Sequence, residues 1–177
     1  MNIFATSYDP KECARVLDDK RVVKMIVETC QILSSAMHIL RIEGPPYKPT
    51  HMGHPCVLWV ASEYDNFRWT VEHLEALINE YKERFPGREH LCERYLPLFK
   101  SIEKTNKSFR NILYMWGNDP KNPQKFKNCT PYKHIKDVCM AYKMSLIHKW
   151  NNDKRRPRWG GIEKTEEERK LLLNLND

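Results

Sequence analysis

Two adjacent carboxylates, Asp18 and Asp19, are the residues of this sequence best suited to acid–base chemistry. In a helix that turns about 100° per residue, Asp19 would lie on the apolar side with Val23 and Ile26. A carboxylate on that side is costly unless it is paired or functional, which makes Asp19 and Asp18 candidates for a general acid or base. Two structural interpretations stay open, because one Asp could cap a helix or form a buried ion pair with a histidine.

A second candidate cluster is the motif His51-x-x-His54-Pro55-Cys56. It offers three potential zinc ligands, but no fourth ligand is identifiable and the spacing fits no standard zinc site. We therefore predict no bound metal and no other cofactor. The favoured interpretation is a pair of imidazoles that line a cleft, with His54 beside the catalytic carboxylate and His51 bound to phosphate. A Pro-rich loop whose histidines make only structural hydrogen bonds is the alternative.

The third feature is a basic segment that contains tryptophan. Five cations and two tryptophans lie within the eleven residues from Lys149 to Trp159. Cations neutralise phosphate, and an indole offers a flat face on which a base can stack. The segment predicts nucleic-acid contact through Lys149, Trp150, Asn152, Lys154, Arg155, Arg156, Arg158 and Trp159. The alternative is a basic surface turn whose tryptophans cover the edge of the core.

Asp153, within this basic segment, does not fit phosphate binding, because a carboxylate repels phosphate. It is expected to hold Arg155 or Arg156 in place, or to belong to the active site itself. Lys20, Arg21 and Lys24 are further candidates for phosphate contact. They share the polar face of the first predicted helix with Glu28 and Gln31.

Helices are the elements that the sequence predicts around these residues. Apolar residues recur at helical spacing over residues 11–40, over a stretch that begins at Cys56 or Glu63 and ends at Phe85, and over 89–102, 132–150 and 165–173. In the first of these, the residues expected to face inward are Val22, Met25, Ile26, Thr29, Leu33 and Ala36. Residues 117–131 are expected to form a loop, and no convincing hairpin is found. The fold class is mainly α: a single compact helical domain over residues 1–177 with Pro-rich loops, or with 160–177 as a peripheral tail.

The start of the predicted helix over 132–150 is a further anion-binding candidate. Thr130 is suited to cap this helix, with Pro131 at its first position. Its unpaired N–H groups, together with Lys133, would then bind a phosphate. A cap without a ligand explains the same residues equally well.

Composition limits the classes of protein to consider. The 177 residues carry a formal net charge of +7, which favours a polyanionic partner. No apolar run approaches the roughly 20 residues of a membrane span, and no signal peptide is expected, so we predict a cytoplasmic protein without a membrane partner. The phosphate loop of NTPases, the zinc-deaminase signature and the Gly-x-Ser-x-Gly elbow do not occur. The six cysteines are spread along the chain and are expected to be reduced thiols.

Several of these features occur together in known proteins. Along its whole length the chain resembles small phage-encoded proteins of uncharacterised function that carry Asp-Lys-x-Val-x-Lys-Met and Trp-Asn-x-Asp-x-Arg-x-Pro-x-Trp. The opening Met1-Asn2-Ile3-Phe4, the helix with Leu17-Asp18-Asp19, His54-Pro55 and the long helix that ends Tyr81-Lys82-Glu83-Arg84 follow in that order. Over roughly the first 85 residues this order resembles the pyrimidine-dimer DNA glycosylases of the phage endonuclease V type, which are small, all-helical enzymes.

The resemblance implies cleavage of the N-glycosidic bond of a damaged or modified base, with double-stranded DNA as the partner. It implies that Asp19 takes the place of the catalytic glutamate and that Trp59 or Trp159 stacks on a base. In that family an N-terminal amine attacks after the methionine is removed, whereas Asn2 is too large for efficient removal. We therefore expect a hydrolytic glycosylase without a lyase step. A non-enzymatic phage DNA-binding protein, or an enzyme that acts on a modified pyrimidine nucleotide, is the alternative.

Overall fold

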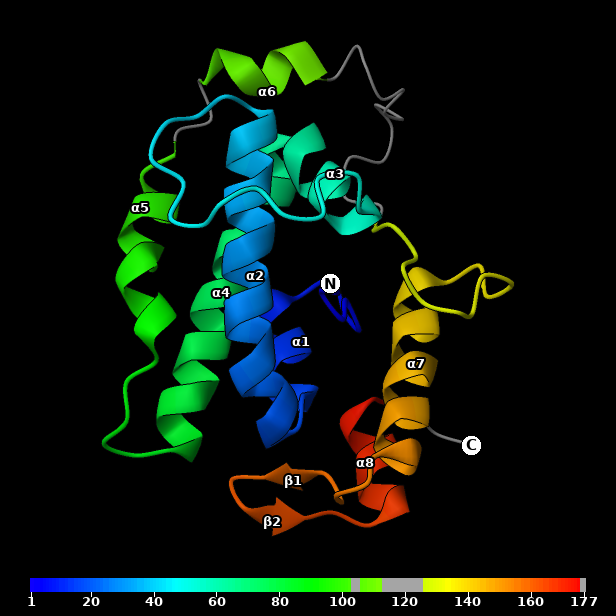
Figure 1. The fold of residues 1–177 in the computed structure, drawn as a ribbon. Helices are drawn as coiled ribbons and strands as arrows, with labels where there is room; N and C mark the ends of the chain where they lie inside the picture. The colour runs from blue at the N-terminus through cyan, green and yellow to red at the C-terminus, as the bar shows by residue number, and fades with distance from the viewer. Residues whose placement is uncertain (103–105, 113–125, 176–177) are drawn as a thin grey trace.

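The protein is described by a computed structural model that covers residues 1–102, 106–112 and 126–175 (Figure 1). It is mainly helical, as predicted, with one two-stranded hairpin among the described residues. The elements are α1 (Pro10–Val16), α2 (Asp19–Ile39), α3 (Pro55–Ser62), α4 (Tyr64–Arg84), a 3-10 helix (Leu91–Tyr95), α5 (Leu96–Lys100), α6 (Lys107–Ile112), α7 (Val138–Asn152), β1 (Arg158–Trp159), β2 (Ile162–Glu163) and α8 (Glu166–Leu172).

Helix α2 is the centre of the fold and packs against α3 and α4, while α1 packs against α4. It contains no Gly or Pro, and its apolar residues recur every three or four positions, which is the pattern of a helix with a buried face. The inward-facing residues predicted for it are all buried: Val22, Met25, Ile26, Thr29, Leu33 and Ala36. Hydrophobic periodicity therefore predicted the face of α2 correctly.

The same helix also has the length and composition of a membrane span. Its mean hydropathy reaches 1.2 over the relevant window, but 61% of that window is buried within the fold. A core helix of a globular domain passes the same test, and α2 is such a helix because α3 and α4 pack against it.

The first predicted helix is broken into two, and the second follows the later of its two predicted starts, with a separate short helix, α3, before it. The first ends at Val16 and resumes at Asp19, because Leu17 has an extended backbone (ψ 140°) and Asp18 occupies the N-cap position. The second is separated from α3 at Glu63, whose φ of −141° lies outside the helical range. The start at Glu63 is confirmed, and Asp18 occupies the N-cap position that one of the open alternatives gave to an Asp.

The late helix begins later than predicted. α7 starts at Val138 with Asp137 as its N-cap, and the Asp137 side chain accepts from the backbone N–H of Met140. Thr130 instead closes a local turn, in which its hydroxyl accepts from the backbone N–H of Tyr132. The helix N-terminus expected beside Lys133 is therefore wrong, and the anion site proposed there loses its basis. Of the loop predicted over 117–131, residues 126–131 contain no helix or strand, and the others lie outside the described residues.

A short hairpin that the sequence did not predict follows α7. Strands β1 and β2 pair Arg158 with Glu163 and Trp159 with Ile162. The two residues between them are Gly160 and Gly161, with φ of +59° and +81°. A two-residue turn of this kind needs positive φ at both positions, which glycine adopts without strain. The hairpin lies at one end of the fold beside α8, whose capping box at Thr165 agrees with the predicted short helix (Figure 1).

Candidate functional site

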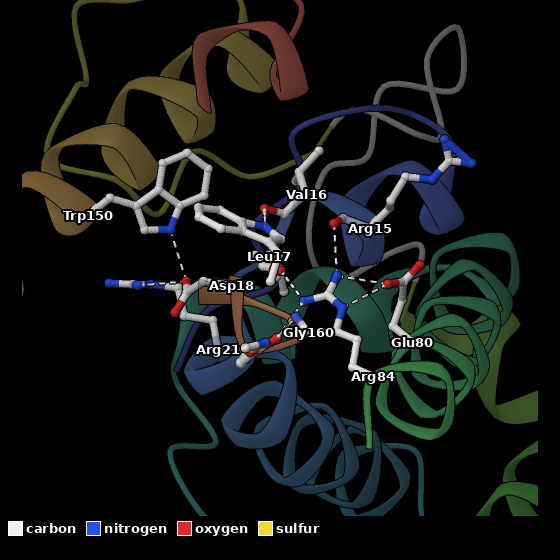
Figure 2. Close-up of polar contacts among 12 residues, drawn as sticks. Arg15, Val16, Leu17, Asp18, Arg21, Glu80, Arg84, Trp150 and Gly160 are labelled. Atoms are coloured by element: carbon white, nitrogen blue, oxygen red, sulfur yellow. Dashed lines mark hydrogen bonds and ion pairs between the residues drawn. The ribbon is translucent and has the colours of Figure 1, made fainter. Parts of the chain in front are cut away.

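Asp18 lies inside the protein at the corner between α1 and α2. Its side chain is 1% exposed, and its Oδ1 accepts hydrogen bonds from Arg21 Nη1 at 2.7 Å and from Trp150 Nε1 at 2.9 Å (Figure 2). Asp18 therefore forms a buried ion pair, which was one of the two structural interpretations, but its partner is Arg21 instead of a histidine. In this arrangement Asp18 has no access to a substrate.

Asp19 is the first residue of α2 and binds the hairpin. Its two carboxylate oxygens accept from the backbone N–H groups of Gly160 at 2.8 Å and Gly161 at 2.9 Å. Arg84 Nη1 lies 3.4 Å from the same carboxylate. The expected position on the apolar side is wrong, because the helix begins at Asp19 and the side chain turns toward the hairpin. The catalytic role assigned to Asp19 stays a prediction, although its partners give it a structural function.

Arg84 joins this corner from α4. It donates to the backbone carbonyls of Leu17 at 2.6 Å and Arg15 at 2.9 Å, and it forms an ion pair with Glu80 at 2.7 Å (Figure 2). These carbonyls lie at the end of α1, where they have no partner within a helix. Arg84 therefore fixes the turn that presents Asp18 and Asp19.

Asp153 completes the corner from the end of α7. It accepts from Arg21 at 2.8 Å and from Lys20 at 3.2 Å, and not from Arg155 or Arg156 as predicted. Burial alone would raise the pKa of Asp153, but hydrogen bonds and positive charge from Arg21 and Lys20 hold it below its usual range. Arg21 is 7% exposed and shared between two carboxylates, so phosphate binding by Arg21 has no support in this arrangement. We call Asp18, Asp19, Arg21, Arg84 and Asp153 the corner cluster.

The tryptophans of the basic segment belong to the core. Trp150 is 2% exposed and Trp159 is 8% exposed, and their rings meet edge to face with centroids 5.2 Å apart. Trp59, the other stacking candidate, is also buried. Base stacking by these residues stays a prediction that this arrangement does not support, because the tryptophans cover the edge of the core, as in the alternative interpretation.

The cations of the same segment lie outside. Lys149, Lys154, Arg155, Arg156 and Arg158 are exposed, as is Asn152. Two of these cations share a single acidic partner: Arg156 lies 3.6 Å and Arg158 3.1 Å from Glu163 of the hairpin. The basic segment therefore offers positive charge to solvent without aromatic surface, which suits contact with a phosphate backbone.

A different carboxylate, Glu28, lies against the start of the chain. Its Oε2 accepts from the backbone N–H of Asn2 at 3.2 Å, and its Oε1 pairs with Lys24 at 3.1 Å. The Glu28 side chain is 16% exposed, so solvent still reaches it. It lies nine residues beyond Asp19, which is about 13 Å along a helix that rises 1.5 Å per residue. Glu28 and the corner cluster are therefore separate sites on α2.

The histidine loop faces the same region as Glu28. His54 is the N-cap of α3, and its Nδ1 accepts from the backbone N–H of Cys56 at 3.2 Å. Burial, followed by the positive charges of the N-terminus and of His51, lowers the pKa of His54, while Glu28 opposes the shift. His51 is exposed and bonds to the Thr50 hydroxyl. We call Asn2, Lys24, Glu28 and His54 the N-terminal cluster.

Two thiols adjoin His54. The Sγ atoms of Cys56 and Cys129 lie 3.3 Å apart, although 73 residues separate them in the sequence. The hydrogen bond from Cys56, with smaller contributions from Tyr142 and Lys133, lowers the pKa of Cys129. The same pairing raises the pKa of Cys56. Lys133 is exposed and donates to the Asn128 carbonyl, which places its charge beside the thiols instead of at a helix start.

Lysines connect the basic segment with Glu28 along one face of α2. Lys20, Lys24 and Glu28 follow at intervals of four residues, so they lie one above another. Both lysine side chains are 67% exposed. Lys20 reaches Asp153 at the end of α7, and Lys24 reaches Glu28. Positive charge therefore extends from the corner cluster to the N-terminal cluster.

One pocket among the described residues is lined by none of the predicted site residues. Its volume is about 660 Å³, and Tyr8, Glu12, Lys136, Asp137 and Leu171 are among the residues that line it. Tyr8 is 65% exposed and stacks on Phe126 with centroids 5.4 Å apart. An accessible aromatic ring is thus present in the N-terminal segment, although the sequence pointed to the tryptophans.

Comparison with known proteins agrees with the resemblance found in the sequence. The family model for pyrimidine dimer DNA glycosylases matches residues 1–92, which is more than half of the 177-residue chain. This region contains α1 to α4, the N-terminal cluster and most of the corner cluster, but not the basic segment. No curated protein and no solved structure matches the chain.

Proposed function

Because the chain belongs to the pyrimidine dimer DNA glycosylase family, we propose that it cleaves the N-glycosidic bond of a damaged or modified base in DNA. Membership of the family supports a glycosylase-like function with DNA as its substrate. The choice of a damaged or modified base, the double-stranded form of the DNA and the residues that act are part of the proposal. The observation that carries it is Glu28, a half-buried carboxylate that accepts from the backbone N–H of Asn2 and pairs with Lys24.

Glycosidic cleavage develops positive charge on the sugar, and a nearby carboxylate stabilises that charge or activates the attacking water. Glu28 suits this role better than Asp19 does. One partner of Glu28 is Lys24, whose exposed ion pair is worth at most about 1 kcal/mol, so the lysine can turn toward a phosphate. The partners of Asp19 are two backbone N–H groups and the largely buried Arg84, so releasing its carboxylate would detach the hairpin.

The basic face of α2 supplies the contact with DNA in this proposal. Lys20 and Lys24 would bind successive phosphates, and the exposed cations of the basic segment would extend that contact beyond α7. His51 and His54 lie at the other end of this face, where a neutral imidazole can donate a hydrogen bond to phosphate. The extruded base would then reach Glu28 between the lysines and the histidine loop.

The proposal predicts that the protein creates abasic sites in duplex DNA. Ultraviolet-irradiated duplex and duplexes with modified pyrimidines are incubated with the protein, and abasic sites are measured by strand cleavage after alkali. Mass spectrometry of the supernatant identifies any base that is released. We expect abasic sites in at least one lesion-bearing duplex and none in the matched unmodified duplex. Binding without abasic sites in every duplex would favour the non-enzymatic DNA-binding protein instead.

The lysine face is tested by a double variant, Lys20→Ala with Lys24→Ala. Loss of two phosphate contacts should weaken binding to all duplexes and lower the slope of log affinity against log salt by roughly 2. The matched control is Lys100→Ala, which removes an exposed lysine of α5 that forms an ion pair with Glu75 of α4. We expect the control to bind as the wild type does. An unchanged salt slope in the double variant would exclude this face from the DNA contact.

A further inference from the structure

Three potential metal ligands converge beside the N-terminal cluster. His54, Cys56 and Cys129 each offer one ligand atom, and these atoms lie within 4.8 Å of one another. The motif His51-x-x-His54-Pro55-Cys56 supplied no suitable set by itself. The structure adds Cys129 from the segment before α7 and leaves His51 aside. We propose that His54, Cys56 and Cys129 form a binding site for Zn²⁺.

The chemistry of the ligands selects the metal. Two thiolates and an imidazole suit Zn²⁺, whereas Mg²⁺ and Ca²⁺ prefer oxygen ligands. Three protein ligands leave the fourth position of a tetrahedral zinc ion to water or to another oxygen or nitrogen. Binding forms two zinc–sulfur bonds and one zinc–nitrogen bond, releases the protons that the thiols carry, and changes no oxidation state.

The observed geometry needs only small movements to hold the ion. Zinc–sulfur bonds of about 2.3 Å in a tetrahedral site place two sulfurs about 3.8 Å apart. The Sγ atoms of Cys56 and Cys129 lie 3.3 Å apart, so they must separate by roughly 0.5 Å. Cys56 is held in the first turn of α3, whereas Cys129 is half-buried in a segment without helix or strand, so we assign this movement to Cys129.

To bind the ion, His54 must also give up one weak hydrogen bond, the one that its Nδ1 accepts from the backbone of Cys56. His54 Nδ1 accepts from the Cys56 backbone N–H at 3.2 Å, so the neutral ring carries its proton on Nε2. Metal binding through Nε2 moves that proton to Nδ1 and gives up this hydrogen bond. Binding through Nδ1 replaces the hydrogen bond directly. Either choice keeps the ring at the start of α3, next to the two thiols.

Bound zinc would tie two distant parts of the chain together. Cys129 lies in the segment that leads to α7, and His54 and Cys56 begin α3 within the region that the family model matches. The ion would therefore hold the C-terminal elements against the N-terminal cluster. This inference does not rest on base excision, because metal binding is measured on the protein alone.

The test is a Zn²⁺ titration of the reduced, metal-stripped protein against a chromophoric chelator. We expect about one Zn²⁺ per chain. Co²⁺ used in its place should give the absorption of a tetrahedral thiolate site. The Cys129→Ser variant should lose more affinity than the roughly 10–100-fold that loss of an outer-shell partner costs. Zn²⁺ should also raise the melting temperature of the wild type and not that of this variant.

Cys139→Ser is the matched control, because Cys139 is a cysteine of α7 outside the ligand group. It should bind Zn²⁺ as tightly as the wild type does. His54→Ala provides a second variant on the other side of the site and should also weaken binding. Absence of stoichiometric Zn²⁺ binding, or equal affinity in Cys129→Ser and the wild type, would overturn the proposal. So would a Cys56–Cys129 disulfide in protein kept under reducing conditions.

Discussion

Replacing Glu28 by Gln is expected to slow base release by about 10²–10⁴-fold, the range that a positioned acid or base contributes. Gln keeps the size of the side chain, and its carbonyl oxygen can still accept from the backbone N–H of Asn2, as Glu28 does. The variant loses only the negative charge that would stabilise the sugar cation or activate water. Single-turnover rates on the lesion-bearing duplex with the highest wild-type rate measure the effect.

A binding measurement and a matched control variant separate the effect of Glu28 on the reaction from its effect on DNA binding. Removal of a negative charge beside Lys24 should leave DNA affinity unchanged or slightly increased, because the lysine no longer has an acidic competitor. Glu72→Gln is the matched control, since Glu72 is an exposed glutamate of α4 in an ion pair with Arg68. We expect that control to release bases at the wild-type rate. A wild-type rate in Glu28→Gln would remove Glu28 from the reaction.

Replacing Arg21 by Met is expected to cost about 3–5 kcal/mol of unfolding free energy, as the loss of one partner of a buried ion pair does. Met keeps much of the apolar stem but removes the charge shared by Asp18 and Asp153. Asp18 is 1% exposed, so its carboxylate would stay buried with Trp150 as its remaining hydrogen-bond donor. Urea unfolding at neutral pH measures the loss.

Lys20→Met is the control for this prediction, because Lys20 pairs with the same Asp153 from an exposed position. An exposed pair contributes at most about 1 kcal/mol, so the control should lose little stability. Comparable small losses in Arg21→Met and Lys20→Met would show that the corner cluster does not hold α7 to α2. The expected difference would support a structural function for the corner cluster.

The helices, their buried faces and several of their ends could be predicted from local sequence, whereas the start of α7 could not. Prolines and the three-to-four spacing of apolar residues identified α2 and its inward face. The break before α2 was only an open alternative, because Leu17 fits the apolar spacing of an unbroken helix. The hairpin was missed because each strand has two residues, although the Gly160-Gly161 pair is a turn signal that could have revealed it.

The candidate site was harder to predict because its residues meet through tertiary contacts. Glu28 was placed correctly on the polar face of the helix, but Asn2, which donates to it, lies 26 residues away. Cys129 joins Cys56 across 73 residues, so the motif around His54 seemed to lack a ligand. The residue types of a segment do not show which side chains are buried. Trp150 and Trp159 were therefore predicted to be exposed stacking surfaces, although both are buried.

We propose that Glu28, and not Asp19, is the carboxylate that acts on the glycosidic bond. The decisive measurement is single-turnover base release by Glu28→Gln and Asp19→Asn, on the same lesion-bearing duplex and at a temperature where both are folded. We predict that Glu28→Gln loses about 10²–10⁴-fold in rate, while Asp19→Asn keeps most of the wild-type rate and unfolds at lower urea. Abolished base release in Asp19→Asn, with a wild-type rate in Glu28→Gln, would assign the reaction to Asp19 instead.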